Sequence, residues 1–195
     1  MEEILAVALG YLVGSVPFAF LLARRRGVDL RRAGSGNVGA ANVLRTTGPM
    51  VAVLALGLDA GKGAVAVLAA RWLTEGPATP VAAGLAAVIG HIYPAWLRFR
   101  GGKGVATAAG VFAVLAPTAL AIAGGVFVVV VWVSRYISAG SMAGAITLAA
   151  ASGASNVAPA VTVGAAISAL IIVHGHRANV ARLVAGTERR VGQRL

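Results

Sequence analysis

Two short glycine-rich stretches hold the residues of this sequence that are best suited to chemistry. One is GSGNVGAANVLRTTG at 34–48, and the other is RFRGGKGVAT at 98–107. Closely spaced glycines let a backbone approach a ligand and aim N–H groups at an anion, and Arg45 can hold a phosphate through two hydrogen bonds. In the second stretch Lys103 precedes an apolar segment, so an ammonium group and a helix N-terminus would meet there. Both stretches indicate anion binding, although a flexible turn and ordinary topology anchors explain part of each pattern.

Several familiar catalytic motifs are missing. The spacing GxxxxGK[ST] of a P-loop fails at both places where Gly-Lys-Gly occurs, so nucleotide hydrolysis is not supported. None of the three histidines is followed five residues later by Asp, and GxSxG does not occur. The six acidic residues suggest no close carboxylate pair, and cysteine is absent. We therefore expect no metal and no other cofactor.

Two further polar features fall within apolar sequence. Asp59 and Lys62 are three residues apart, so on a helix they would share a face and pair. Charge inside a membrane is costly and suggests a functional position, but an ion pair that only holds packing is an equal alternative. His91, near the end of an apolar run, is more readily a hydrogen-bonded packing residue than a catalyst.

The C-terminal stretch VHGHRANVARLVAGTERR, at 173–190, is amphipathic. As a helix it would place His176, Asn179 and Arg182 on one face, whereas His174 and His176 would point apart and make a poor metal pair. A polar stripe of this kind is usually a solvated face. Its predicted position on the same membrane side as the glycine-rich loops favours a role in closing a site.

The remaining sequence is that of an integral membrane protein. Its mean hydropathy is +0.86, and only 12% of its 195 residues are charged. Alternation at period two is absent, so the apolar runs predict helices rather than barrel strands. A crossing takes about 20 helical residues, which leaves little room for a soluble domain. We expect a single integral membrane domain over 1–195. The long runs are 4–23, 46–70, 76–97, 104–134 and 136–176.

Positive charge predicts how often the chain crosses. The run 136–176 is too long for one crossing and should turn at SGASN, 152–156, while 104–134 is either one long helix or two short ones hinged near 117–125. If both are hairpins, 15 of the 17 cations lie on one side, in the loops 24–48, 98–103 and 135–141 and in the tail from Gly175. The positive-inside rule then favours an all-α polytopic fold with seven transmembrane helices, the N-terminus outside and the C-terminus cytoplasmic. Nucleic acid binding is a poorer explanation of the net charge of +11, because aromatic platforms are missing.

The ordered motifs resemble one known family. GSGNVGAANVLRTTG, DAGKG, GHIYPAWLRFRGGKGVAT, RYISAGS and HRANVARLVAGTE are similar to the motifs of the bacterial PlsY family, the acyl-phosphate-dependent glycerol-3-phosphate acyltransferases, in order and over nearly the whole chain. The family usually has Thr where this chain has Ala41. The resemblance implies that an acyl group passes from acyl phosphate to the 1-hydroxyl of glycerol 3-phosphate, as the first step of phospholipid synthesis. It also implies a multi-pass protein of the bacterial inner membrane with its site facing the cytoplasm. We expect the lipid bilayer and the two small substrates as partners, and a monomer.

The resemblance and the residue chemistry together suggest the site. We expect Arg45 and Lys103 to bind phosphate and stabilise the oxyanion, and His176 or the phosphate of the donor to act as base; the second is favoured because an activated phosphoanhydride needs little help. For Glu188, pairing with Arg177 or Arg182 is at least as good an interpretation as a role in catalysis. The expected catalytic residues are Lys103, Arg45, His176, Asn179, Ser35 and Ser141. The expected substrate-binding residues are Gly34, Gly36, Asn37, Gly39, Asn42, His91, Gly101, Gly102, Gly104, Ser138 and Glu188.

Two other classes share part of the pattern. A small anion transporter would also contain intramembrane charge and glycines, but its site should lie near the midplane between inverted repeats, and no repeat is evident. A CDP-alcohol phosphotransferase would suit a lipid interface, but it needs several Asp residues for metal.

Overall fold

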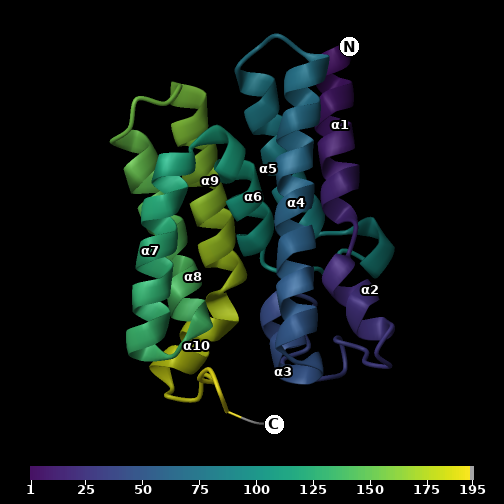
Figure 1. Cartoon of the computed structure of the whole chain (residues 1–195), viewed down its shortest axis with the longest axis vertical. Coiled ribbons are helices and arrows are strands. Elements are labelled where there is room, and N and C mark those ends of the chain that lie inside the picture. The colour runs from purple at the N-terminus through teal and green to yellow at the C-terminus, as the bar shows by residue number, and fades with distance from the viewer. Residues whose placement is uncertain (194–195) are drawn as a thin grey trace. The chain divides into compact units, whose positions relative to one another are not determined.

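The protein is almost entirely helical. The computed structural model describes residues 1–193, and every regular element in that range is helical (Figure 1). The predicted all-α class is therefore confirmed. In chain order the elements are α1 (Glu2–Ser15), α2 (Phe18–Arg24), α3 (Ala40–Thr47), α4 (Pro49–Leu73), α5 (Ala78–Ile92), the 3-10 turn η1 (Ala95–Leu97), α6 (Val105–Leu115), α7 (Pro117–Ser134), α8 (Ile137–Gly153), α9 (Pro159–Gly175) and α10 (Arg177–Val184).

The chain divides into two compact units. The first runs from Met1 to Val114 and contains α1 to α5, η1 and nearly all of α6; the second begins at Leu115 and contains α7 to α10. The expectation of one integral membrane domain stays a prediction.

In the first unit α1, α4 and α5 lie side by side (Figure 1). Small residues allow the backbones to approach closely: a Cβ added to Gly14 of α1 would overlap the backbone of Ala87 in α5, and one added to Gly110 of α6 would overlap the carbonyl of Ala60 in α4. Helices in lipid gain most of their association from such close packing, since lipid tails are as apolar as the side chains. The helix α1 ends at Ser15, just before Pro17, because proline has no backbone N–H to continue the helix. Pro17 thus separates α1 from α2.

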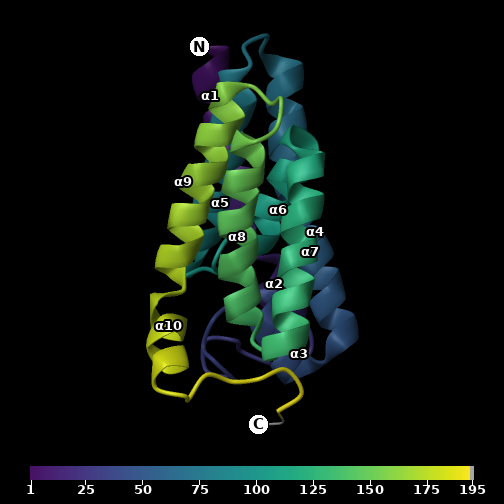
Figure 2. The same ribbon diagram turned by 90° about the vertical axis from the view of Figure 1, so that its left-hand side faces the viewer.

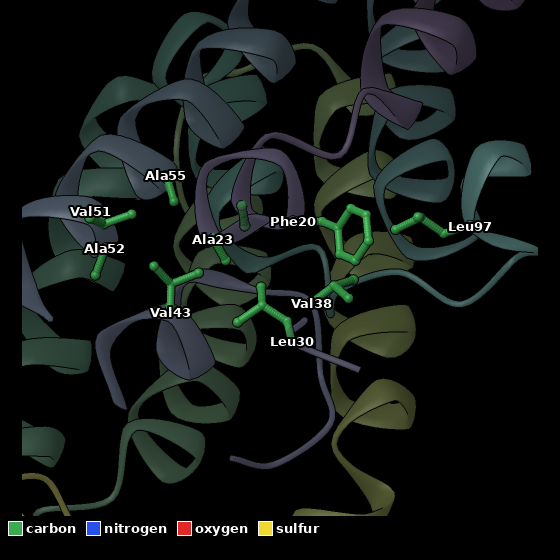
Figure 3. Close-up of a cluster of buried hydrophobic side chains, with 10 residues drawn as sticks. Phe20, Ala23, Leu30, Val38, Val43, Val51, Ala52, Ala55 and Leu97 are labelled. Atoms are coloured by element: carbon green, nitrogen blue, oxygen red, sulfur yellow. The ribbon is translucent and has the colours of Figure 1, made fainter. Parts of the chain in front are cut away.

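A cluster of buried hydrophobic side chains packs against the first glycine-rich loop. Figure 3 shows Phe20 and Ala23 of α2 and Val43 of α3 together with Leu30 and Val38 from the loop. Leu30 and Val43 are fully buried. The loop is thus held by its own apolar side chains and by the two short helices on either side of it.

In the second unit α7, α8 and α9 pack in sequence order, and α10 turns away from the end of α9 (Figure 2). Gly140 lets α8 approach α7, because a Cβ there would crowd Val131 and Phe127. The axes of α9 and α10 meet at an angle of 55° at His176.

The helices agree with much of the predicted crossing pattern. Within residues 1–193 four segments are long and apolar enough to cross a membrane, counting 2–24 as one broken span, and the bent pair α9–α10 makes a fifth. The helices α6 and α8 are shorter and apolar. The run 104–134 is broken at Ala116, as in the two-helix alternative, and the turn predicted at 152–156 is confirmed because α8 ends at Gly153 and α9 begins at Pro159.

One predicted loop is much shorter than expected. The expected loop 135–141 consists of Arg135 and Tyr136 alone, because α8 already begins at Ile137. Arg135 has a left-handed backbone with φ of 63°, which ends α7 and turns the chain directly into α8. Ser138 and Ser141 are therefore residues of a helix rather than of a loop.

Candidate functional site

The first glycine-rich loop is shaped by Asn42. Its side-chain amide donates to the carbonyl oxygens of Leu30, Ala33 and Asn37 at 2.9 to 3.2 Å, and its Oδ1 accepts the backbone N–H of Ser35 at 2.9 Å. Asn42 is 1% exposed. A buried amide with this many backbone partners holds the loop in shape. The expectation that Asn42 also contacts substrate stays a prediction.

Glycine is required at two points of this loop. Gly34 has φ of +61° and Gly36 has φ of +73°, which side chains rarely adopt, and a Cβ at Gly34 would also overlap Oδ1 of Asn42. Gly39 precedes α3 as its N-cap. Because the turn is tight, Ser35 lies exposed at its tip, with its hydroxyl available to solvent or to a ligand.

The two glycine-rich stretches meet. Asn37 Nδ2 lies 3.5 Å from the carbonyl oxygen of Gly101, and Asn37 Oδ1 accepts the N–H of Gly39 at 3.0 Å. A Cβ at Gly39 would lie 4.0 Å from the Cα of Gly102. The N-terminus of α3 therefore abuts the Gly101–Gly102 backbone, although the two segments are about 60 residues apart in sequence.

The second loop is compact and locally strained. Arg98 and Phe99 have φ of 53° and 59°, a left-handed conformation that costs a residue with a side chain about 1–2 kcal/mol. The N–H groups of Gly101 and Gly102 donate back to the carbonyls of Ile92 and His91 at 2.8 and 3.1 Å. The chain is thus folded back onto the end of α5.

The two expected phosphate-binding cations lie on these elements. Arg45 is half-buried in the last turn of α3, and Lys103 is half-buried between the glycines and the start of α6. Gly104 follows Lys103 with φ of +81°. Each cation thus lies within one of the two glycine-rich stretches. This is the arrangement expected for anion binding.

The predicted Asp59–Lys62 pair is confirmed. Lys62 Nζ lies 2.8 Å from Asp59 Oδ1 and donates to the carbonyl of Val16 at 2.9 Å, at the break between α1 and α2. The Nδ1 atom of His91 lies 3.6 Å from the same carboxylate oxygen. His91 is 8% exposed, in agreement with the packing interpretation of this residue.

The second unit contains another polar cluster, centred on Glu188. Its Oε1 accepts hydrogen bonds from Ser138 at 2.8 Å and from Asn179 at 2.6 Å, while its Oε2 pairs with Arg182 at 2.7 Å. Burial tends to raise the pKa of the Glu188 carboxyl, but the hydrogen bonds from Asn179, Ser138 and Arg182 outweigh burial and lower that pKa below its ordinary value.

Glu188 therefore has a structural task. The predicted pairing with Arg182 is confirmed. The substrate-binding role expected for Glu188 stays a prediction. Gly186, with φ of +69°, ends α10 and reverses the chain so that Glu188 returns to the helix. Sequence reasoning missed Gly186, although Gly just after an amphipathic helix is a known C-terminal signal.

The other predicted residues of the second unit lie nearby. His176 is 3% exposed, and its Nδ1 lies 2.7 Å from the carbonyl of Ile172. Since a carbonyl only accepts, Nδ1 carries the proton of the neutral ring and the lone pair is on Nε2. Ser141 is buried and donates to the carbonyl of Ile137, while His174 is exposed, so the two histidines point apart as predicted.

Within residues 1–193 no group of three or more His, Asp or Glu side chains is placed to hold a metal ion. The two glycine-rich stretches of the first unit carry the guanidinium of Arg45 and the ammonium of Lys103. Such groups bind and polarise phosphate esters and anhydrides.

Comparisons with known proteins agree with this chemistry. The family described as glycerol-3-phosphate acyltransferase matches residues 4–186. A glycerol-3-phosphate acyltransferase of Geobacter metallireducens is 50% identical over 188 residues, which cover 96% of this chain and 97% of the relative. One from Anaeromyxobacter sp. is 46% identical over 193 residues, covering 95% and 94%.

Solved structures are also similar. The crystal structure of PlsY (YgiH), an integral membrane glycerol 3-phosphate acyltransferase, in its glycerol 3-phosphate form has a TM-score of 0.93 at 35% identity, covering 98% of this chain and 96% of that one. Its lysophosphatidic acid form has a TM-score of 0.91 at 34% identity. The chain therefore belongs to the glycerol-3-phosphate acyltransferase family and is an integral membrane acyltransferase.

Proposed function

We propose that this protein transfers a fatty acyl group from acyl phosphate to the 1-hydroxyl of glycerol 3-phosphate, forming lysophosphatidic acid and inorganic phosphate. The observation that carries the proposal is the junction of the two glycine-rich segments through Asn37 and Gly101, on elements that also carry Arg45 and Lys103. Both proposed substrates contain phosphate, so a site with two cations on closely approaching backbones suits them. The glycerol 3-phosphate and lysophosphatidic acid forms of the PlsY structure support the acceptor and the product.

In the proposed reaction the C1 hydroxyl oxygen of glycerol 3-phosphate attacks the acyl carbonyl carbon. The bond from that carbon to the phosphate oxygen then breaks, and phosphate leaves with the electron pair. Lys103 and Arg45 bind the phosphates and stabilise the negative charge that develops on the carbonyl oxygen. The Gly34–Gly39 and Gly101–Gly102 backbones lie against the phosphates, because glycine permits close approach, while the N–H groups of Gly101 and Gly102 themselves donate to Ile92 and His91. The resemblance assigns Ser35, Ser141 and Asn179 to orienting polar atoms. The acyl chain remains in the apolar phase of the bilayer.

The proton of the attacking hydroxyl goes to a phosphate oxygen of the donor. A protein base contributes only about 10²- to 10⁴-fold, and an acyl phosphate is already activated. His176 is the alternative base, because its Nε2 holds the lone pair. A His176→Ala protein that keeps most of its turnover supports the substrate-assisted route; loss of turnover with intact substrate binding reverses it.

We also infer seven crossings, with the N-terminus outside and the C-terminus and the site cytoplasmic, in the inner membrane of a bacterium. Seven apolar helical segments support this count, if the broken α1–α2 is one span and α6 and α8 each make a short one. Fifteen of the 17 cations then lie on one side. One of them, Arg194, lies outside the described residues. We further propose that the protein acts as a monomer.

The test is a donor comparison with purified protein. Lysophosphatidic acid should form from glycerol 3-phosphate with acyl phosphate, and not with acyl-CoA, whether or not a chelator is present. Arg45→Ala and Lys103→Ala should each lower kcat/KM by about 10- to 100-fold. Product formed from acyl-CoA alone would reject the proposed donor, and inhibition by chelator would reject the metal-free chemistry.

A further inference from the structure

His91 contacts the Gly101–Gly102 backbone in two ways. Its carbonyl oxygen accepts the N–H of Gly102 at 3.1 Å, and its imidazole lies directly against the same residue, because a Cβ added to Gly102 would overlap Nε2 of the ring. The position of the imidazole therefore determines how closely this backbone can approach α5. Lys103, the expected phosphate ligand, is the next residue along the chain.

The position of the imidazole depends in turn on two charged residues of α4. Asp59 Oδ1 lies 3.6 Å from Nδ1 of His91, and Lys62 lies 2.8 Å from the same oxygen. Lys62 also donates to the carbonyl of Val16, at the break between α1 and α2, which accepts the N–H of Phe18 as well. A continuous set of polar contacts thus runs from the break in the first span, through α4, to the second glycine-rich loop.

The Asp59 carboxylate is deeply buried and under-coordinated. It is 1% exposed, and within the described chain neither of its oxygens accepts a hydrogen bond of good geometry, even though Lys62 is close enough for an ion pair. A small cavity of about 10 Å³ adjoins it, and Asp59, Lys62, His91, Gly101 and Gly102 are among the lining residues. The carboxylate, the imidazole of His91 and the Gly101–Gly102 backbone thus line the same small cavity, and Nδ1 of His91 lies at ion-pair distance from the carboxylate.

A buried group of charged residues such as this one is not the usual way to stabilise a membrane protein. Replacing a buried ion pair by apolar residues of similar volume is often neutral or stabilising, and ionisable residues inside a membrane by default mark function. Packing alone therefore does not account for Asp59, Lys62 and His91 at this place.

We propose that Asp59, Lys62 and His91 position the Gly101–Gly102 backbone, and through it Lys103, for binding the phosphate group of a substrate. Asp59 orients the imidazole of His91. Lys62 neutralises the charge of Asp59 and also contacts the first span at Val16. His91 packs against the Gly101–Gly102 backbone and holds it in position. The inference rests on the proposed function, since it takes Lys103 as a phosphate ligand. All three are positioning residues and touch no reacting atom.

The experiment measures KM for glycerol 3-phosphate and kcat in an Asp59→Leu/Lys62→Met protein, in which both charges are removed together and volume is kept. Misplacing the loop should lower kcat/KM by about 10²-fold. Most of that loss should lie in KM, because contacts to phosphate are made in the ground state as well. A purely structural role would lower the melting temperature and the active fraction and leave KM unchanged. Wild-type KM in the folded double variant overturns the proposal.

Two further variants make the comparison specific. In a Lys103→Ala background the double change should cost at most about twofold more, because the residue it positions is already lost. Gly61→Ala, on α4 between the two charges, has open space around the added Cβ and should keep wild-type constants. An equal loss in the presence and absence of Lys103 contradicts the proposal.

If the double variant does not fold, His91→Phe and His91→Asn replace it, since both leave the ion pair intact. The Asn amide can still donate to Asp59, so it should recover at least tenfold in kcat/KM over the Phe variant; identical KM values for both and for wild type overturn the proposal. An inactive wild type with acyl phosphate would instead reject the proposed donor, and these constants would then be measured with the donor that works.

Discussion

Removal of the Glu188 carboxylate should lower the free energy of unfolding of the second unit. The size of the decrease can be worked out from the three contacts of this carboxylate. Glu188→Ala removes the charged acceptor that lies 2.6 Å from the buried Asn179 amide, and loss of this hydrogen bond costs about 2 kcal/mol. Ser138 can turn its hydroxyl toward a carbonyl of its own helix, so its loss is small. The Arg182 pair adds at most about 1 kcal/mol, because that side chain is 42% exposed. The sum is about 3 kcal/mol.

The assay is thermal unfolding in detergent at pH 7. For a chain of this size about 3 kcal/mol corresponds to a decrease of roughly 6 to 12 °C in the melting temperature. Glu188→Gln should lose only about 1 kcal/mol, since its amide oxygen can still accept from Asn179 and Ser138 while the ion pair is lost. The matched control is Glu75→Ala, which removes an exposed carboxylate and should leave the melting temperature unchanged.

The same cluster predicts the pH dependence. Because the pKa of Glu188 is lower in the folded protein than its ordinary value of 4.5, its contribution is fully present above about pH 4.5 and is lost as the pH falls through the folded pKa. The difference in melting temperature between wild type and Glu188→Gln should therefore shrink below pH 4.5. An alanine variant that melts like wild type, or a difference that grows in acid, would refute the reasoning.

Three other changes test the remaining features. Gly63→Ala should lower the melting temperature by several degrees and reduce yield, because the added Cβ would overlap a backbone carbonyl of α6, whereas Gly57→Ala on the same helix meets open space and should have no effect. Arg45→Ala should lower kcat/KM by about 10- to 100-fold through loss of charged hydrogen bonds, and Arg45→Lys should recover only part of that loss because it lacks the bidentate fork; equal activity of all three proteins would exclude a phosphate contact. The natural chain has no cysteine, so an Asn156→Cys protein should react with an impermeant thiol reagent from outside intact cells and an Arg190→Cys protein should not; labelling of both from one side contradicts seven crossings.

The sequence alone determined the features that depend on composition and on local spacing. Long uncharged runs predicted membrane helices, because a bilayer allows little else, and the three-residue spacing of Asp59 and Lys62 predicted their ion pair. The turn at 152–156 followed from the length of its run. The ordered motifs predicted the family, which the comparisons confirm.

Only the tertiary structure decided which polar residues hold others in place. In the sequence Asn42 and Glu188 resemble substrate ligands by residue type. In the structure both are buried, and their hydrogen-bond partners come from other segments of the chain. The contact of His91 with Gly102 and Asp59 joins α4, α5 and the loop before α6. A sequence lists side chains by type and spacing along the chain, whereas hydrogen-bond partners are set by which distant backbones pack together.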